Sequence, residues 1–126
     1  MKTPSGELTI QTLAMPADTN ANGDIFGGWL VSQMDLAAGV LARRLAKGRA
    51  ATVAINSMSF LRPVHVGDLV SCHVELAKLG KTSMTMKVEV WVMRSENGEH
   101  YQVTEGIFVF VAIDDEGKPR LVPEIL

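Results

Sequence analysis

The residue with the clearest potential for chemistry is Asp35, which lies in the otherwise uncharged stretch of residues 31–39. A carboxylate in such a stretch is costly to bury unless it is paired or hydrogen-bonded. Its neighbours one helical turn away include Ser32, Ala38 and Gly39, which leave room for a ligand or another backbone. A desolvated carboxylate beside such a groove can be a base or a nucleophile, and it can equally be a structural residue bonded to a neighbouring strand. The residues alone leave both interpretations open.

A second candidate lies just before, in the motif from Asp24 to Gly28. Asp24 precedes a predicted helix and could be an ordinary N-cap. Gly27 and Gly28 would expose free N–H groups at the positive end of that helix, where they can hold an oxyanion or polarise a carbonyl. Each glycine costs about 1 kcal/mol of helix stability relative to alanine. That cost hints at a close approach by a ligand, although two glycines are a weak signal by themselves.

Polar residues elsewhere are candidate ligand contacts. Asn22 could line the same site or, with Asn20, build a turn, and the turn is the simpler interpretation. Lys81, Thr82 and Ser83 place a cation and two hydroxyls at a strand start, which suits a phosphate or simply a solvated turn. Arg62 is another possible phosphate contact, with a surface salt bridge as the alternative.

Composition excludes several other classes. With 12 basic and 14 acidic residues the net charge is −2, which lacks the basic footprint of a general nucleic-acid-binding protein. The single cysteine, Cys72, is expected to be a buried hydrophobe. The three histidines have no partner at a recognisable spacing, and no phosphate-binding or dinucleotide motif is present. The longest apolar run, residues 107–113, is far short of the ~20 residues of a membrane helix, and residues 1–8 do not resemble a signal peptide. We therefore expect a soluble, cytoplasmic protein.

The hydrophobic pattern predicts the elements that position these residues. Residues 26–47 are typical of a helix, which Gly48 ends. Residues 29–41 carry no charge except Asp35, which predicts that the middle of the helix is buried nearly all round. Residues 82–94 alternate strictly, as expected of a strand. The remaining strands are expected at residues 7–15, 51–62, 69–78 and 101–114, with a polar loop at 17–24 and an irregular tail at 115–126.

This order, β-α-β-β-β-β, predicts a single α+β domain over residues 1–126. The simplest packing is an antiparallel sheet curled around the one long helix. Such a sheet leaves open edges, which many proteins cover by forming oligomers.

Four stretches resemble hot-dog acyl-CoA thioesterases of the YciA type. They are residues 12–35 (TLAMPADTNANGDIFGGWLVSQMD), 58–68 (MSFLRPVHVGD), 88–92 (VEVWV) and 110–120 (FVAIDDEGKPR). The resemblance extends from about residue 8 to residue 123, and the first stretch is long and specific.

The resemblance implies a hot-dog fold, in which an antiparallel sheet of about five strands wraps one long central helix. It implies that protomers pair with their sheets side by side, with the active sites between them, and that dimers gather into hexamers as a trimer of dimers. The implied reaction belongs to fatty acid metabolism and hydrolyses acyl-CoA to a free carboxylic acid and CoA. No cofactor is implied, since CoA is part of substrate and product, and neither nucleic acid nor membrane is an expected partner.

Carried over by position, the essential carboxylate is Asp35, acting as general base or nucleophile. Asp24 would act from the opposite protomer, and the N–H of Gly28, alone or with that of Gly27, would polarise the thioester carbonyl. CoA would contact Arg62, Lys81, Thr82 and Ser83. Because Asp35 must be ionised in either role, the rate is expected to fall at low pH.

Two alternatives stay open at this point. A non-catalytic hot-dog module would bind acyl-CoA without turnover. A hot-dog hydratase or dehydratase would use a catalytic histidine, and no histidine lies near the predicted helix start.

Overall fold

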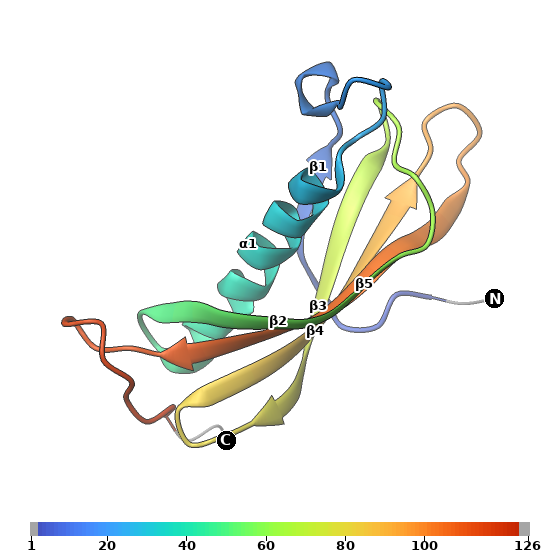
Figure 1. Cartoon of the computed structure of the whole chain (residues 1–126). Helices are drawn as coiled ribbons and strands as arrows, with labels where there is room; N and C mark the ends of the chain where they lie inside the picture. Colours follow the sequence, from blue (N-terminus) through green and yellow to red (C-terminus); the bar gives the residue numbers. More distant parts are fainter. Residues whose placement is uncertain (1–2, 124–126) are drawn as a thin grey trace.

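The computed structural model describes residues 3–123, in which one long helix lies across one face of a single antiparallel sheet (Figure 1). The helix is α1 (Gly27–Ala46), and the strands are β1 (Glu7–Leu13), β2 (Ala50–Phe60), β3 (Leu69–Leu79), β4 (Ser83–Met93) and β5 (His100–Ala112). The predicted α+β class is confirmed, with boundaries close to those expected. One element was not predicted, a single 3-10 turn, η1 (Pro16–Asp18), inside the polar loop.

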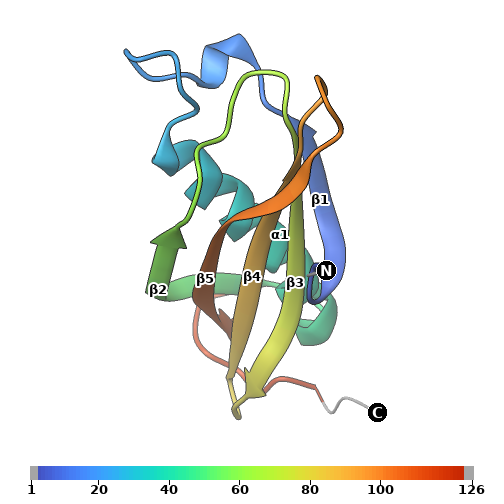
Figure 2. The same cartoon turned by 90° about the vertical axis from the view of Figure 1, so that its right-hand side faces the viewer.

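The sheet has the order β1-β3-β4-β5-β2, with every neighbouring pair antiparallel. Figure 2 shows the strands side by side in this order, with α1 behind them. Strand β2 directly follows the helix in the chain, yet it pairs only with β5 at the far edge. This crossover places β2 beside α1 and, within residues 3–123, leaves one side of β2 without a partner strand.

The core lies between the sheet and one flank of α1. The alternation predicted for β4 is confirmed, since its inward side chains are fully buried: Met84, Met86, Val88, Val90 and Val92. The helix faces them with the fully buried Met34 and with small residues, Ala37, Ala38, Ala42 and Ala46. Alanines in these positions let the helix lie close to the sheet. Within residues 3–123, no helix is both long and apolar enough to cross a bilayer.

The prediction that the middle of the helix is buried nearly all round was wrong for the single protomer. Leu36 is 59% exposed and Val40 is 42% exposed. The sheet covers only one flank of the helix, and the other flank, next to β2, is exposed. The helix flank is apolar, as the sequence indicates, but no part of residues 3–123 covers Leu36 and Val40.

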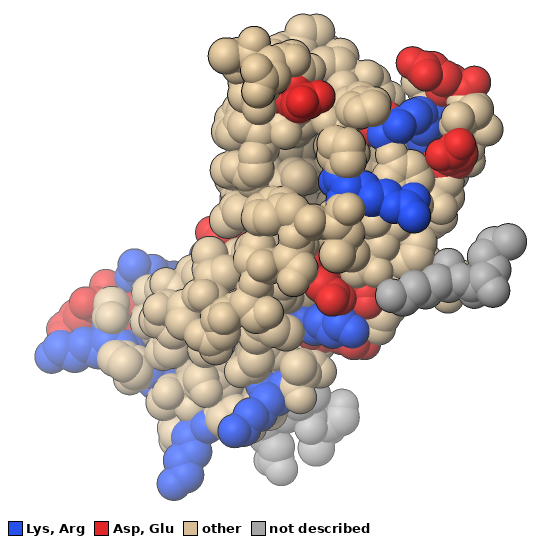
Figure 3. Space-filling model, turned by 45° about the vertical axis from the view of Figure 1, so that its right-hand side comes forward, with Lys and Arg blue, Asp and Glu red and all other residues tan. Residues whose placement is uncertain are grey.

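The neighbouring strand β2 shows the same feature. Its sequence, AATVAINSMSF, contains no charged residue, and Val53, Ile55 and Phe60 are about half exposed. A wide region without Lys, Arg, Asp or Glu occupies the middle of the face in Figure 3. Native proteins usually protect an open strand edge with charges or prolines, and β2 has neither. Such an edge beside an apolar helix flank is typical of a surface that another chain covers.

Candidate active site

Asp35 lies on α1 at the side that faces β2, and it is only partly buried rather than fully desolvated as expected. Its Oδ1 accepts a hydrogen bond from Oγ1 of Thr52 on β2, at 2.6 Å. This is the only hydrogen bond to the Asp35 side chain among residues 3–123, so Oδ2 is free. The bond matches the structural interpretation of Asp35, and it is equally compatible with a carboxylate that is held by one oxygen and keeps the other for chemistry.

Thr52 was missed by the sequence reasoning. It lies 17 positions after Asp35, on a different element, so no local pattern connects the two residues. The signal that could have found it is the strand pattern itself. A threonine in an apolar strand next to the helix is a natural donor to a half-buried carboxylate.

At the start of α1 the N-cap is Phe26, with φ −76° and ψ 149° and no side-chain capping bond. The ordinary explanation of Asp24 as an N-cap is therefore excluded. Gly27 and Gly28 form the exposed beginning of the first turn, where N–H groups have no acceptor within the helix.

Neither glycine is required by packing inside the protomer. A Cβ added to Gly27 would lie 3.6 Å from the Phe60 ring, and one added to Gly28 would lie 3.5 Å from the Phe26 ring, both ordinary contacts. Contacts among the described residues therefore do not explain the stability cost of two glycines in a helix. The two glycines therefore indicate that a ligand or a partner chain approaches the start of the helix.

The loop before the helix is built by Asn20. Its Oδ1 accepts the N–H of Asn22 at 2.9 Å and the N–H of Asp24 at 3.1 Å. Within the described part of the chain, the side chains of Asn22 and Asp24 form no hydrogen bond and are exposed. The turn interpretation thus holds for Asn20, while Asn22 and Asp24 are free to contact a ligand or a partner.

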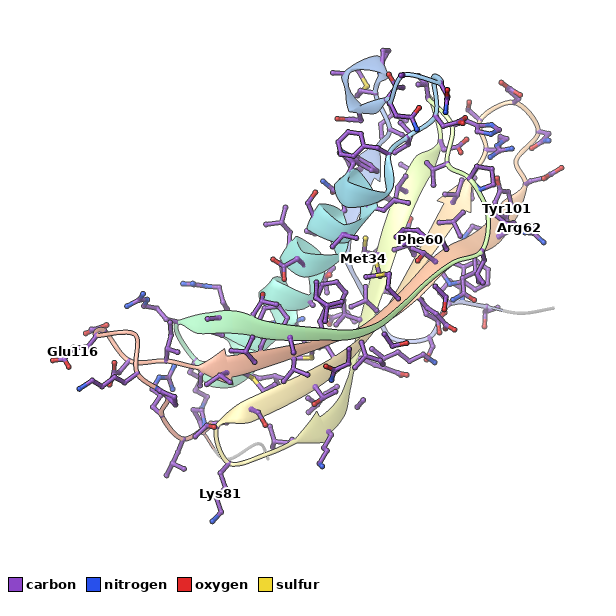
Figure 4. The ribbon with its side chains drawn as sticks, in the orientation of Figure 1. Met34, Phe60, Arg62, Lys81, Tyr101 and Glu116 are labelled. Atoms are coloured by element: carbon purple, nitrogen blue, oxygen red, sulfur yellow. The ribbon has the colours of Figure 1, made fainter. Side chains whose placement is uncertain are left out.

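A cavity of about 370 Å³ opens beside the helix start, and Gly27, Leu30, Phe60 and Arg62 are among the residues that line it. One wall therefore includes Gly27 of the candidate oxyanion site, another is apolar, and the cation Arg62 also lines the cavity. Phe60, the last residue of β2, lies near Gly27 at this end of the helix. Arg62 follows two residues later and lies beside Tyr101 (Figure 4).

The predicted CoA contacts are not brought together in one protomer. Lys81, Thr82 and Ser83 lie at the β3–β4 turn, where the carbonyl of Lys81 accepts the N–H of Val122 at 2.8 Å. The exposed Lys81 side chain points away from the sheet, at the opposite end from Arg62 (Figure 4). Since β4 has 11 residues, the end of the sheet that carries Lys81 is about 35 Å from the end near Arg62.

The helix also separates the two catalytic candidates. Gly28 and Asp35 are seven residues apart on α1, which corresponds to about 10 Å along the axis. Both groups would need to lie within about 3 Å of the same reacting carbonyl. Asp35 and the glycine N–H groups of one chain therefore cannot act on one thioester together.

Comparison with known proteins identifies the family. Residues 22–97 match the family model of the Thioesterase superfamily. The acyl-CoA thioester hydrolase YciA of Salmonella typhimurium is 54% identical over 124 residues, which cover 96% of this chain and 93% of that protein.

Solved structures agree with this match. A hexameric thioesterase from Yersinia pestis has a TM-score of 0.93 at 53% identity, covering 98% of this chain and 100% of the other. An aspartate-to-alanine mutant of a hexameric broad specificity acyl-coenzyme A thioesterase has a TM-score of 0.93 at 51% identity, covering 95% and 88%. With its helix, wrapped sheet and matching sequence, the chain belongs to the hot-dog Thioesterase superfamily and, within it, to the YciA-type acyl-CoA thioester hydrolases.

Proposed function

We propose that this chain hydrolyses acyl-CoA to a carboxylic acid and CoA in a site that two protomers build together. The observation that carries the proposal is the arrangement on α1. A carboxylate with one free oxygen and an exposed pair of glycine N–H groups lie on one helix, too far apart to act within one chain. In two-fold pairing, Asp35 of one protomer meets Gly27 and Gly28 of its partner, and the pairing repeats to give two sites.

The pairing surface follows from the exposed apolar residues. Joining two β2 edges antiparallel would extend the sheet across both protomers and pair the free backbone groups of both strands. It would also bring the exposed flank of α1, with Leu36 and Val40, next to the partner. The predicted trimer of dimers remains part of the proposal, and it is supported by the hexameric relatives. The cytoplasmic location stays a prediction.

The chemistry follows from the two halves of the site. The thioester oxygen accepts hydrogen bonds from the Gly28 N–H, and from that of Gly27, and these bonds strengthen as negative charge develops. Asp24, at the same helix start, contacts the substrate from the glycine side. No metal or redox cofactor is needed for these steps.

Two routes are open to Asp35 of the other protomer. As a general base it takes a proton from water, the resulting hydroxide attacks the carbonyl carbon, and the C–S bond breaks as the proton passes to the CoA thiolate. As a nucleophile it attacks the carbonyl carbon itself, releases CoA thiolate and forms a mixed anhydride, which water then opens to the acid and free Asp35. In both routes Thr52 holds Oδ1 so that Oδ2 faces the substrate.

The cavity between the helix start and Phe60 gives the thioester its approach, and Arg62 at its rim is positioned for the CoA phosphates. Asn22, exposed in the loop before the helix, remains a candidate substrate contact. Lys81, Thr82 and Ser83 are too far from this cavity in their own protomer, so any role in binding this CoA would have to come from another protomer of the assembly.

The first test is CoA thiol release from a panel of acyl-CoAs by the wild type and by Asp35→Asn. Rapid release by the wild type and loss of about 10³-fold or more in the variant is expected, since Asn provides neither a base nor a nucleophile. Circular dichroism and the oligomeric state serve as folding controls. Tight acyl-CoA binding without release at any chain length would instead identify a non-catalytic acyl-CoA-binding module.

The composite site has its own test in subunit complementation. Gly28→Pro removes one N–H at a position in the first helical turn, where proline is tolerated, and Gly27→Pro does the same one residue earlier. Each variant is co-expressed with Asp35→Asn, so that mixed dimers contain one doubly altered site and one intact site. Random pairing should restore about a quarter of the wild-type sites. Mixed dimers as inactive as the two parents would refute a site shared between protomers.

A further inference from the structure

Arg62 contacts an aromatic ring and no carboxylate in the described part of the chain. It forms no ion pair within residues 3–123, and its guanidinium lies over the ring of Tyr101, 4.8 Å from the ring centroid. The side chain is exposed at the rim of the cavity that Gly27 also lines. Its positive charge is therefore uncompensated and faces the entrance to the candidate active site.

The Tyr101 ring is itself fixed by a second guanidinium. Arg94 lies 5.2 Å from the same ring centroid. Arg94 donates to both carboxylate oxygens of Asp68, through Nε at 3.2 Å and Nη2 at 3.1 Å. Asp68 is 2% exposed and also accepts the N–H of His65 at 2.8 Å. The chain of contacts thus leads from a buried carboxylate to an exposed cation.

The charges along this series of contacts assign different roles to the two arginines. Asp68 neutralises Arg94, which leaves Arg94 as a structural support. Burial raises the pKa of Tyr101, so its ring is a neutral phenol at neutral pH. Arg62 alone keeps a net charge, and an aromatic face attracts and orients a guanidinium without neutralising it.

We propose that Tyr101 is a positioning residue, whose ring holds Arg62 at the cavity rim so that the guanidinium contacts a phosphate group of the CoA nucleotide. This inference rests on the proposed function and adds a recognition device to it. The pantetheine arm separates the thioester from the phosphates, so one substrate can reach both the helix start and Arg62. A planar guanidinium is suited to two parallel hydrogen bonds with a phosphate, and pre-orienting it reduces the conformational entropy lost on binding.

The test compares acyl-CoA with the corresponding acyl-pantetheine, which has the same thioester and no phosphate. Arg62→Ala should raise KM for acyl-CoA about tenfold, because a charge-assisted contact is lost. Tyr101→Leu should raise it about two- to fivefold, because Arg62 is present but no longer oriented. Neither variant should raise KM for acyl-pantetheine, and neither should lower kcat in proportion. Tyr101→Phe keeps the ring and should restore the low KM.

Controls separate positioning from general damage. Lys118→Ala removes an exposed cation from the turn containing Glu116, at the far end of the protomer, and should leave both KM values unchanged (Figure 4). In the double variant Arg62→Ala/Tyr101→Leu, the KM should equal that of Arg62→Ala alone, since the ring acts only through Arg62. If Tyr101→Leu does not fold, Arg62→Lys at the exposed site serves instead. It keeps the charge without the planar stacking, and its KM should lie between those of the wild type and Arg62→Ala.

The possible results are distinct. A KM increase that is equal for both substrates, or additive effects in the double variant, would overturn the role of Tyr101. So would an unchanged KM in Tyr101→Leu, or a wild-type KM in Arg62→Lys where that variant is used. Failure of the proposed function would look different, because the wild type would then hydrolyse neither acyl-CoA nor acyl-pantetheine.

Discussion

Replacing Thr52 by valine removes one hydroxyl group and keeps the shape of the side chain. Valine is β-branched like threonine and suits the β2 strand, so the change should alter the hydrogen bond to Asp35 and little else. After the change, Asp35 has no hydrogen-bond partner among residues 3–123 that fixes its orientation. The carboxylate can then rotate away from the direction in which Oδ2 faces the substrate.

The size of the effect follows from the type of bond. A hydrogen bond to a charged group contributes about 1.5–3 kcal/mol. Thr52 is exposed in the protomer, so water can replace its hydroxyl in part, and the lower end applies there. A loss of about 1.4 kcal/mol corresponds to a tenfold decrease in kcat. If the partner protomer covers Thr52, water is excluded and the decrease should approach about 100-fold.

The assay is CoA release at saturating acyl-CoA, with Thr52→Ser as the matched control because serine keeps the hydroxyl. We expect kcat to fall at least tenfold in Thr52→Val, to recover most of its value in Thr52→Ser, and KM to change little in both. Wild-type kcat in Thr52→Val, combined with an inactive Asp35→Asn, would show that Asp35 acts without help from β2. The orienting role of Thr52 would then be wrong.

Other predictions concern stability. Gly6→Ala should lower the free energy of unfolding by about 1–3 kcal/mol, because φ is +96° and a Cβ would lie 2.7 Å from the backbone of Val74 on β3. The matched control in thermal melts is Gly98→Ala, where φ is +72° but no atom of the described residues lies within 4 Å of the added Cβ. An equal loss of stability in both variants would show that the contact with β3 does not contribute. Glu89→Gln should flatten the acid dependence of stability. Burial alone would raise the pKa of Glu89, but hydrogen bonds from Trp91, the Ser5 N–H and Lys87, with the nearby Lys87 charge, hold it below the usual 4.5. The stability from this carboxylate is therefore present above about pH 4.5 and lost as the pH falls through the lower folded-state pKa. Urea unfolding at neutral pH and at about pH 3.5 should show a smaller acid loss in Glu89→Gln than in the wild type, and an identical loss would contradict the assignment. Arg94→Met should cost about 3 kcal/mol in the same assay, because Asp68 would be left as a buried charge without its cation, and a loss below about 1 kcal/mol would show that Asp68 is satisfied by the His65 N–H alone.

The sequence predicted those parts of the structure that depend on local pattern. The strict alternation in β4, the glycine after α1 and the turn formers around Asn20 each constrain nearby backbone, and each was placed correctly. The fold class followed from the order of these elements. The resemblance to a known family added the prediction that protomers pair, which local pattern cannot provide.

What the sequence did not provide depends on contacts between distant residues. Thr52 and Asp35 meet only because β2 crosses to the edge beside α1. Arg62 and Tyr101 meet only because β5 lies beside the end of β2. The exposure of Leu36 and Val40 was missed for a different reason, since residues that cover a core and residues that cover an interface have the same apolar composition.

The open edge of β2 also determines how the stability of this chain must be measured. A protomer that needs a partner to cover β2 and the α1 flank has a folded state whose free energy includes association. For such a dimer, each tenfold dilution lowers the apparent free energy of unfolding by about 1.4 kcal/mol per pair. Its melting temperature is therefore a value for a stated protein concentration. Below the concentration at which pairs separate, activity per protomer should disappear even though every chain keeps its Asp35 and its glycines.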